Sequence, residues 1–448
     1  MTFIEVAGAK IDTRHYIGGQ RVASAETYTN TSPIDGTFLG EISAAGEDEV
    51  NQAVAAAKAA FPGWWKLGAK GRGELLMKLA DLVEANVETL SQLETLDNGS
   101  LLRSHRRGVM PRVAMNIRFF AEYAMNDLKH EDLETRGHTN KISWDPSGVA
   151  AIITPWNAPL MLATWRIGPA LAAGDTVVLK PAEWTPLSAS FFADLTKQAG
   201  IPDGVFNVIQ GYGRVAGAAL TAHKDIARIA FTGSVPTAKI IAKAAAENLT
   251  PTSFELGGKS PLVIFGDSDL DLAATIAVEQ YDNAGQVCLS GTRLLVHESI
   301  ADAFAEKFRE KAALVKQGDP RDETTDIGPQ IHKVHFDRVK GFVDRAREEG
   351  AKGRHAKGRA CTALARSSAF CWMFLSITVP WPASWRACAQ VVATPIGRAL
   401  RTAPGPARVS RCGSARTIPW GLWSSPTSSG STSACRSCRC STRACRIP

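Results

Sequence analysis

Cys288 is the only cysteine in the first 352 residues, and it lies in a segment that favours covalent chemistry. The segment AGQVCLSGTR (284–293) places this thiol beside glycines and hydroxyl residues, between a predicted helix and a predicted strand. A lone cysteine is more often an inert buried residue than a nucleophile. Two polar side chains in other segments favour the catalytic interpretation.

Glu255 and Asn157 are these two side chains. The segment FELGGKSP (254–261) places Glu255 at the end of a predicted short strand, before a glycine pair that lets the backbone pass close to a ligand. The segment ITPWNAPLM (153–161) ends a buried strand near Asn157 and opens a helix through Pro159. Taken singly, Glu255 could be a surface carboxylate and Asn157 an ordinary helix cap.

Together, a thiol, a carboxylate and an amide can oxidise a carbonyl compound. A cysteine thiolate attacks the carbonyl carbon, and the oxygen becomes an anion that needs positioned N–H donors. Asn157 can supply one donor and the backbone N–H of Cys288 another. Transfer of a hydride from the tetrahedral adduct to an acceptor bound beside it leaves a thioester. Glu255 can activate the water that hydrolyses this thioester, and a partly apolar site would make it a better base.

The elements that must position these residues predict an α/β fold. From residue 149 onward, short apolar runs alternate with helical stretches, which indicates a parallel sheet with crossover helices. The runs are VAAIIT (149–154), TVVLK (176–180), VFNVI (205–209), IARIAF (226–231) and PLVIF (261–265). The helical stretches between them begin near Pro159, Pro186, Gly213, Val235 and Asp269. Because strands buried on both faces are continuously apolar, we predict a doubly wound parallel sheet.

The flanking segments complete the prediction. Short strands with turns are expected at 15–42, a turn at 142–148, and a further strand at 294–297. Apolar residues at helical spacing predict helices at 47–61, 71–96, 103–126, 300–316 and 332–349. The predicted domains are an N-terminal part of the cofactor-binding domain (1–130), a strand and turn connection of the oligomerisation type (131–148), the cofactor-binding α/β domain (149–256), a partial catalytic domain (257–352) and a segment of different character (353–448).

Composition separates this last segment from the rest of the chain. The 448 residues are 45% hydrophobic and 21% charged, with no apolar run long enough for a membrane span and no export signal at the start, which favours a cytoplasmic protein. Residues 353–448 contain no Asp or Glu but fourteen Lys and Arg, eight of the nine cysteines and five of the eleven tryptophans. Residues 1–352 carry a net charge of −7.

Three interpretations of residues 353–448 stay open. A basic, disordered nucleic-acid-binding tail fits the charge, but the tryptophans and cysteines argue against it. A metal site at Cys435, Cys438, Cys440 and Cys445 does not match a standard zinc spacing. We favour a shifted reading frame near Lys352, because acid-free, Arg- and Cys-rich text is typical of a GC-rich gene read out of frame. The segment is then disordered or misfolded, no metal is predicted, and nucleic acid and membranes are not expected partners.

The paired motifs make the resemblance specific. A Glu-Leu-Gly-Gly-Lys-Ser-Pro segment followed about thirty residues later by Gly-Gln-x-Cys resembles the aldehyde dehydrogenase superfamily, over about residues 15–352. The resemblance implies that Cys288 is the nucleophile, Glu255 the general base and Asn157 the oxyanion donor, as the residues themselves indicate. It also implies an aldehyde substrate, NAD as the cofactor, and a homodimer or homotetramer.

The resemblance further implies which residues bind the cofactor. GDTVVLKPAEWTP (174–186) resembles the family strand whose Lys and Glu, here Lys180 and Glu183, hold the adenine ribose; they could otherwise be a solvated charge pair. A carboxylate at Glu183 would accept hydrogen bonds from ribose hydroxyls and repel a 2′-phosphate, which favours NAD over NADP. In FTGSVPTA (231–238), N–H groups near Gly233 and Ser234 can meet the pyrophosphate. The remaining expected cofactor contacts are Thr154, Pro155, Trp156, Gly213 beside the adenine half, Leu256 beside the nicotinamide, and Gln330 near a ribose.

Substrate identity follows less directly from the sequence. MLATWR (161–166) resembles the helix that lines the aldehyde tunnel, with Trp165 either in its wall or in the core. PRVAMNIRFFAEYA (111–124) is similar to the branch that oxidises carboxymethyl-hydroxymuconate semialdehyde, and betaine-aldehyde dehydrogenases share much of it. Arg112 or Arg118 could bind a substrate carboxylate.

The chain also departs from the family pattern. The family's Glu-x-Phe-Gly-Pro segment, which binds the nicotinamide ribose, does not follow Cys288. The expected catalytic domain is therefore incomplete and the expected activity weak or absent. An acylating, coenzyme A-dependent dehydrogenase and an inactive frameshifted remnant stay as alternatives.

Overall fold

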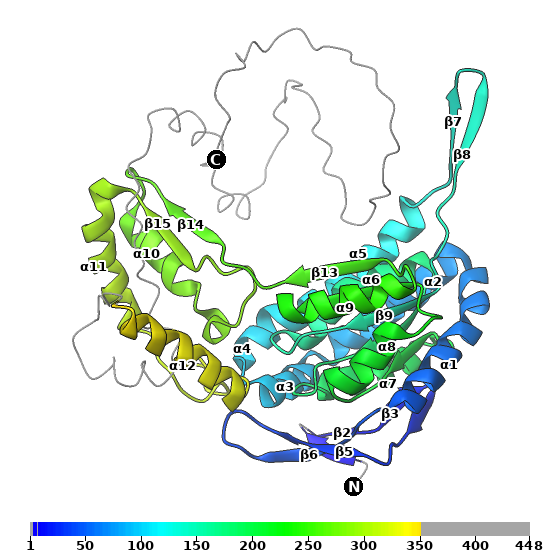
Figure 1. Ribbon diagram of the computed structural model, residues 1–448, viewed down its shortest axis with the longest axis horizontal. Coiled ribbons are helices and arrows are strands. Elements are labelled where there is room, and N and C mark those ends of the chain that lie inside the picture. Colours follow the sequence, from blue (N-terminus) through cyan, green and yellow to red (C-terminus); the bar gives the residue numbers. More distant parts are fainter. Residues whose placement is uncertain (1–2, 7, 351–448) are drawn as a thin grey trace. The chain divides into compact units, whose positions relative to one another are not determined.

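The computed structural model describes residues 3–6 and 8–350, and a seven-stranded sheet forms the centre of this part (Figure 1). Its strand order is β13-β12-β9-β10-β11-β3-β4. The strands are β9 (Val149–Ile153), β10 (Thr176–Lys180), β11 (Phe206–Val208), β12 (Arg228–Gly233), β13 (Thr252–Leu256), β3 (His15–Ile17) and β4 (Gln20–Val22). The strands β9 to β13 are mutually parallel, and β3 joins β11 antiparallel. The chain order reverses between β9 and β12, where ligands bind in open α/β sheets.

Helices cover both faces of this sheet because its central strands β9, β10 and β11 are buried on both sides. On one face Ile152, Val177 and Leu179 pack against α2 (Gly68–Ala85), α5 (Met110–Asn126), α6 (Pro159–Ala173) and α7 (Leu187–Gln198). On the other face Ile153 and Val178 pack against α1 (Glu47–Lys66), η2 (Gly213–Gly217), α8 (Ala218–Ala222) and α9 (Val235–Glu247). The predicted doubly wound sheet is therefore confirmed, but the apolar run at 261–265 lies outside it, and β13 is its fifth parallel strand.

A second small α/β unit follows β13. It pairs β14 (Pro261–Ile264) in parallel with β15 (Arg293–Val296), and the connection runs through α10 (Leu270–Glu279) and η3 (Asp282–Gly285). The chain continues through η4 (Glu298–Ile300), α11 (Ala301–Ala312) and α12 (Lys333–Glu348). Its own core contains Ile264, Leu294, Phe304 and Phe308. Leu272 and Ile276 on α10 stay exposed, so this core is covered only in part by the described residues.

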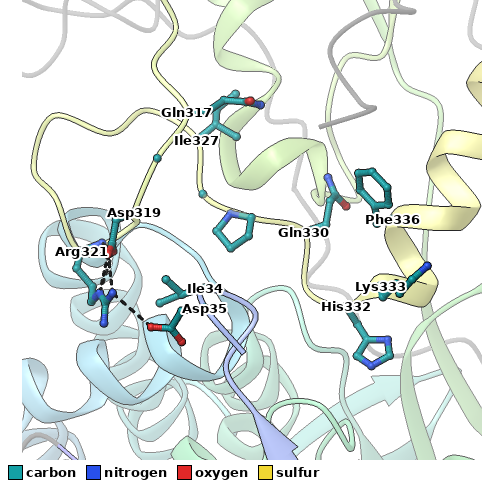
Figure 2. Close-up of a pocket in the computed structure, with 13 residues that line it drawn as sticks. Ile34, Asp35, Gln317, Asp319, Arg321, Ile327, Gln330, His332, Lys333 and Phe336 are labelled. Carbon is teal, nitrogen blue, oxygen red and sulfur yellow. Dashed lines mark hydrogen bonds and ion pairs between the residues drawn. The ribbon is translucent and has the colours of Figure 1, made fainter. Parts of the chain in front are cut away.

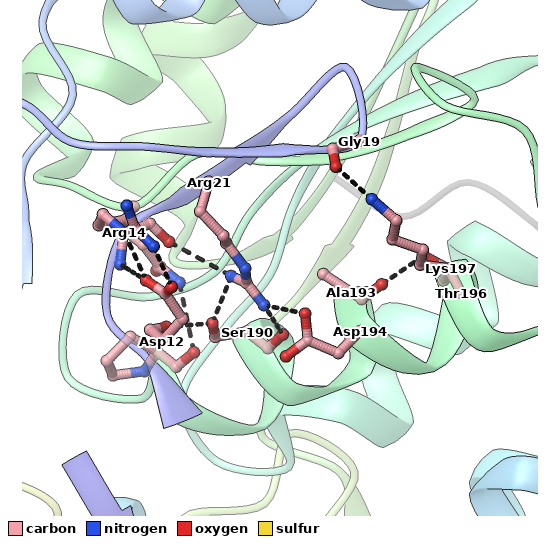
Figure 3. Close-up of polar contacts among 11 residues, drawn as sticks. Asp12, Arg14, Gly19, Arg21, Ser190, Ala193, Asp194, Thr196 and Lys197 are labelled. Carbon is pink, nitrogen blue, oxygen red and sulfur yellow. Dashed lines mark hydrogen bonds and ion pairs between the residues drawn. The ribbon is translucent and has the colours of Figure 1, made fainter. Parts of the chain in front are cut away.

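Polar contacts fasten the N-terminal hairpin β3–β4 to helix α7. The other N-terminal strands, β1 (Phe3–Val6), β2 (Ala9–Asp12), β5 (Thr27–Thr31) and β6 (Phe38–Ser43), form two separate two-stranded sheets. Arg21 on β4 donates hydrogen bonds to the hydroxyl (2.8 Å) and the carbonyl (2.9 Å) of Ser190 and to Asp194 Oδ1 (2.5 Å), both on α7 (Figure 3). Lys197 donates to the carbonyl of Gly19 (2.9 Å), so α7 holds the whole β3–β4 hairpin.

Most predicted elements are present, and the differences lie at element boundaries. The helix expected at 71–96 is two helices, α2 and α3 (Val87–Asn98), because Asn86 leaves helical geometry and its side chain donates to the carbonyl of Leu82. The helix expected at 103–126 begins with α4 (Leu102–Ser104) and a π-helical turn, η1 (His105–Val109), before α5. An exposed hairpin, β7 (Glu131–Thr135) and β8 (His138–Ile142), precedes β9. The predictions for residues 353–448 lie outside the described residues.

Candidate active site

The loop that carries Cys288 begins with an unusual backbone. Between α10 and β15, Asn283 and Ala284 adopt left-handed conformations, with φ of 52° and 57°, and Gly285 follows with φ of 75°. Such a conformation is uncommon for residues with a Cβ and persists only where the surroundings enforce it. Cys288 lies directly beyond this turn, partly buried and with a free thiol.

Two reciprocal hydrogen bonds join this loop to the segment that contains Asn157. Asn157 Nδ2 donates to the carbonyl of Gln286 (2.8 Å), and Asn283 Nδ2 donates to the carbonyl of Asn157 (2.9 Å). Asn157 does not cap α6, whose N-cap is Ala158, so the alternative interpretation as a helix cap is wrong. The two segments lie more than 120 residues apart in the chain. These bonds bring the amide of Asn157 to the loop of residues 283–288 that carries Cys288 and that is called the nucleophile loop after the expected role of this thiol.

Glu255 ends near the same loop but in a more polar place than expected. A Cβ added to Gly258, three residues later, would lie 3.2 Å from the carbonyl of Cys288, so the glycine pair does let two backbones pass closely. The Glu255 side chain is 46% exposed, and its Oε1 lies 3.1 Å from Arg166 Nη2 on α6. A charged partner, rather than an apolar site, therefore defines the surroundings of this carboxylate.

The expected cofactor residues lie along one edge of the sheet. In parallel strands the register aligns Lys180 with Ile153 and Phe231 with Ile153, so β9, β10 and β12 end side by side. Gly233 aligns with Leu256 at the ends of β12 and β13. Residues that directly follow or end these strands are Thr154, Pro155, Trp156, Lys180, Gly233, Ser234 and Leu256.

Lys180 and Glu183 form a partly buried pair. The Lys180 side chain is almost fully buried; its Nζ donates to the carbonyl of Pro181 (2.9 Å) and lies 3.8 Å from Glu183 Oε2. Burial lowers the pKa of Lys180, and the Glu183 carboxylate offsets part of this shift. Glu183 itself is about one third exposed, so a carboxylate oxygen faces outward beside a buried amine. The solvated charge pair considered above is not what forms here.

The two glycine segments differ in their fit. Ser234 is the N-cap of α9 and accepts a hydrogen bond from Thr237 N (3.3 Å), while a Cβ at Gly233 would lie 2.5 Å from the ring of Phe231. Any residue larger than glycine at position 233 would displace the ring of Phe231. Gly213, at the start of η2, has no atom within 4 Å of an added Cβ, so this side of the backbone is open.

The segment before α12 and the first turn of α12 contact Trp156 and Trp184, which lie in the loops that follow β9 and β10. Gln330 Nε2 donates to the carbonyl of Ala284 (3.0 Å), and its buried Oε1 has no hydrogen-bond partner among the described residues. His332 stacks on Trp184 and His335 contacts Trp156 edge-on, each with ring centroids 4.9 Å apart. Burial lowers the pKa of His335, with Arg338 acting in the same direction.

A cavity of about 600 Å³ opens beside this segment. Figure 2 shows Gln330, His332 and Phe336 along it, with the ion-paired Asp35 and Arg321 toward its far side. Its remaining lining residues are Ile34, Gln317, Gly318, Asp319, Ile327, Gly328, Pro329 and Lys333. The cavity touches Gln330 but includes neither Cys288 nor Glu255, so it is adjacent to the candidate site rather than its centre.

The candidate substrate residues lie on two helices that run parallel. Asn116 Nδ2 on α5 donates to Thr164 Oγ1 on α6 (3.1 Å), and one turn later a Cβ at Gly168 would lie 2.8 Å from Phe120. Trp165 is half-buried on α6. Arg118 is already engaged in two ion pairs, since its Nη2 lies 2.6 Å from both Asp81 Oδ1 and Glu84 Oε2.

Arg112 differs from Arg118 in both partners and place. It is exposed, and no partner is recorded for it among the described residues. One helical turn before Asn116, it lies level with the first turn of α6, which directly follows Asn157.

The described residues contain neither a helix suited to a membrane nor a cluster of metal-ligating side chains. No helix there is long and apolar enough to cross a bilayer. Within the same residues, no group of three or more His, Cys, Asp or Glu could hold a metal ion. The cysteines 435, 438, 440 and 445 lie outside this part of the chain.

Sequence reasoning missed three residues of the site. Arg166 was visible only as a basic residue on a predicted helix, and its contact with Glu255 spans 89 residues. Gln286 lies within the cysteine segment and Asn283 directly precedes it, but only the tertiary structure shows that they link this segment to distant loops. An Asn in a loop, two residues before Gly285, could have indicated a left-handed backbone.

Comparison with known proteins agrees with this architecture. The sequence profile described as "Aldehyde dehydrogenase family" matches residues 21–370. A 5-carboxymethyl-2-hydroxymuconate semialdehyde dehydrogenase of Escherichia coli is 40% identical over 340 residues, which cover 75% of this chain and 72% of that protein. A 2-aminomuconic semialdehyde dehydrogenase of Danio rerio is 39% identical over 346 residues, covering 77% and 71%. The crystal structure of PnpE, a protein of Pseudomonas sp. WBC-3, in complex with nicotinamide adenine dinucleotide has a TM-score of 0.74 and 40% identity, covering 80% and 74%.

Proposed function

The chain belongs to the aldehyde dehydrogenase family, and from that membership we propose that it oxidises an aldehyde to a carboxylic acid, with Cys288 as nucleophile and NAD as hydride acceptor. The observation that carries the proposal is the hydrogen bond from Asn157 Nδ2 to the carbonyl of Gln286, two residues before Cys288. It brings an amide donor to the nucleophile loop, as the chemistry of an oxyanion requires.

The first step is attack of the Cys288 thiolate on the aldehyde carbon. The electron pair of the carbonyl moves to oxygen, which becomes an alkoxide. One N–H of Asn157 is engaged by the carbonyl of Gln286, so its second N–H is the one that would meet the alkoxide, together with the backbone N–H of Cys288. Because the Gln286 carbonyl can only accept, it also fixes which end of the amide faces the loop.

The residues at the sheet edge fit a dinucleotide. The buried, unpartnered Oε1 of Gln330 is an acceptor suited to a ribose hydroxyl, and the outward carboxylate of Glu183 is another. The N-terminus of α9 at Ser234 offers backbone N–H groups to a pyrophosphate, and the open side of Gly213 leaves room for the adenine half. Bound NAD supplies a hydride acceptor beside the adduct. The NAD complex of the related PnpE supports this choice.

Glu255 would then serve the hydrolysis of the resulting thioester on Cys288. Arg166 engages Oε1 of this carboxylate, so Oε2 is the oxygen that would take a proton from the attacking water. The hydroxide equivalent attacks the thioester carbonyl, the sulfur leaves as thiolate, and the carboxylic acid product departs. Arg166 would hold this carboxylate in place between turnovers.

We extend the proposal to semialdehydes that carry a carboxylate. The relatives from Escherichia coli and Danio rerio are named for such substrates, and the exposed Arg112 offers a charge-assisted contact near the first turn of α6. Trp165 would form part of the wall between this arginine and Cys288.

The proposed domains are those at 149–256 for the cofactor and 257–352 for catalysis. A partner chain would pack on the exposed β7–β8 hairpin, where the side chains of Leu133 and Ile142 are exposed.

The test is aldehyde-dependent formation of NADH by the full chain. We expect activity that Cys288→Ser abolishes, while Cys361→Ser, a matched loss of one thiol, leaves it unchanged. Product analysis with and without coenzyme A distinguishes hydrolysis from acyl transfer, and a free acid is the expected product. NADH formation that survives Cys288→Ser would overturn the proposal. A folded chain that binds NAD but reduces none of it would favour the inactive remnant.

A further inference from the structure

The turn before Cys288 contains a side chain whose contacts the chemistry above leaves unexplained. Asn283 has a left-handed backbone, and so does Ala284, although neither is a glycine. Two consecutive residues of this kind cost free energy, and such strain is retained where the surrounding contacts enforce it. The contacts of Asn283 therefore show what the turn is built to hold.

All the recorded polar contacts of the Asn283 side chain reach other segments. Its Nδ2 donates to the carbonyl of Asn157 (2.9 Å), and its Oδ1 accepts from the hydroxyl of Ser100 (2.8 Å) after α3. Its own carbonyl accepts from Gln286 Nε2 (3.0 Å). Gln286 in turn accepts from the N–H of Ile331 and presents its carbonyl to Asn157 Nδ2.

These hydrogen bonds link the Asn157 loop and the Cys288 loop in both directions. The side chain of Asn157 holds the backbone of the nucleophile loop, and the side chain of Asn283 holds the backbone of the Asn157 loop. Two hydrogen bonds of opposite direction restrict the movement of one loop relative to the other. They therefore restrict the amide of Asn157 relative to the backbone of Gln286, two residues before Cys288.

We propose that Asn283 is a positioning residue that keeps the Asn157 amide and the Cys288 thiol facing the same carbonyl group. The inference rests on the proposed function, because it assigns these two groups to one reaction. It adds the residue that aligns them and predicts that oxyanion stabilisation, rather than thiol reactivity, depends on it.

Asparagine suits this position for two reasons. It tolerates a left-handed backbone better than most residues with a side chain. Its amide also offers a donor and an acceptor at the same end, and here the donor meets the carbonyl of Asn157 while the acceptor meets Ser100. Aspartate has the same size and keeps the acceptor, but it places a second acceptor against the carbonyl of Asn157.

Two thiol reagents separate the alternatives without needing NAD. An activated ester, p-nitrophenyl acetate, acylates a thiolate through a tetrahedral oxyanion and releases p-nitrophenolate, so its rate depends on the oxyanion donors. Iodoacetamide alkylates the same sulfur by displacement of iodide and forms no oxyanion. The ratio of the two rate constants at Cys288, confirmed by mass spectrometry, therefore reports oxyanion positioning alone.

For Asn283→Asp in the full chain, we expect the acylation rate to fall at least about tenfold, as for loss of an oxyanion donor, while alkylation changes less than about twofold. Asn248→Asp is the matched control, since Asn248 Nδ2 also donates to a backbone carbonyl, that of Ala222 (3.0 Å), at the exposed C-terminal end of α9. It should leave both rates unchanged.

The outcomes distinguish this inference from the proposed function. If Asn283→Asp keeps the ratio of wild type, or lowers both rates together, Asn283 has only a structural role and the inference is wrong, while the proposed function stands. If the unmodified chain is alkylated but not acylated at Cys288, no oxyanion site exists and both are overturned.

Discussion

At the scale of single residues, the two candidate arginines for a substrate carboxylate are separated by their partners. Arg118 lies between Asp81 and Glu84, at 2.6 Å from each, so its charge is already balanced. Arg112 is exposed and lies one turn before Asn116, level with the start of α6. A charge that has no recorded partner in the described structure and lies level with the start of α6 is the better candidate for an acidic substrate.

This difference gives a prediction for substrate preference. Arg112→Gln should lower kcat/KM for a semialdehyde with a carboxylate by about 10- to 100-fold, the loss expected for one charge-assisted hydrogen bond, and leave a neutral aldehyde of the same length unaffected. Steady-state kinetics with both aldehydes measure this. Arg118→Gln is the control and should change neither. An equal loss on both aldehydes would mean that Arg112 supports the fold rather than the substrate.

Residue types and spacing were sufficient for some of the candidate site and insufficient for the rest. Cys288, Glu255 and Asn157 could be selected because each has a chemically distinctive side chain at the end of a predicted strand or in a loop that joins a predicted helix and strand. Arg166 and Asn283 could not, because their significance lies in contacts across 89 and 126 residues, which no local pattern encodes.

At the scale of elements, a buried carboxyl group holds the helix that follows Asn157. Glu94 on α3 accepts from the N–H of Leu160 at the start of α6 (2.7 Å) and from the hydroxyl of Ser188 on α7 (3.0 Å). Its other oxygen lies 3.6 Å from His105 Nδ1 on the π-helical turn. Burial raises the pKa of Glu94 to about 7, against the lowering effect of the two hydrogen bonds, and lowers that of His105 to about 4.

The raised pKa predicts a pH-dependent stability. Above its usual value of 4.5, Glu94 binds its proton more tightly in the folded than in the unfolded chain, so ionisation lowers the free energy of unfolding as the pH rises from about 4.5 to 7. Glu94→Gln keeps an acceptor for Leu160 and Ser188 and removes the ionisation. We expect the variant to gain stability relative to wild type between pH 5 and 8, by up to about 3 kcal/mol.

Denaturation of both proteins at several pH values measures this difference. His105 acts in the opposite direction, because its lowered pKa makes stability rise between about pH 4 and 6.5, and buried Asp97, with a pKa raised to about 8, acts in the same direction as Glu94. To first order both remain in the variant, so they cancel in the comparison. A stability difference that is constant with pH would show that Glu94 stays ionised or stays protonated throughout.

Elements were predictable where their cause is periodic. Four of the five predicted apolar runs form β9 to β12 of the central sheet, and the helices between them follow from helical spacing. The fifth run, at 261–265, contains β14 of the second, two-stranded sheet, and β13 is the fifth parallel strand of the central sheet. The break at Asn86 and the π-helical turn at 105–109 have other causes, a side chain bonded to a carbonyl and a wide turn within a helical pattern. Neither cause changes the spacing of the apolar residues, so this spacing predicts neither the break at Asn86 nor the π-helical turn.

At the scale of the whole molecule, the described part provides the cofactor edge and the nucleophile loop, yet leaves the second core partly covered. Leu272 on α10 and Val263 on β14 stay exposed although they flank buried residues. The sequence shows a matching discontinuity: residues 1–352 contain all 44 Asp and Glu, whereas the remaining 96 contain none. At the frequency of the first part, about twelve would be expected there.

We propose that the reading frame shifts near Lys352, since such a shift would account for both observations. It would replace the residues that cover the core with a sequence that was never selected to fold. We expect the DNA beyond this codon, translated in its other frames, to encode a sequence with ordinary acid content and a Glu-x-Phe-Gly-Pro segment. A chain made in that frame should form NADH faster than the present one, since the glutamate would bind the nicotinamide ribose. Resequencing the gene and assaying both chains measure this. Stop codons or acid-free text in every other frame would leave residues 353–448 as a genuine part of the protein.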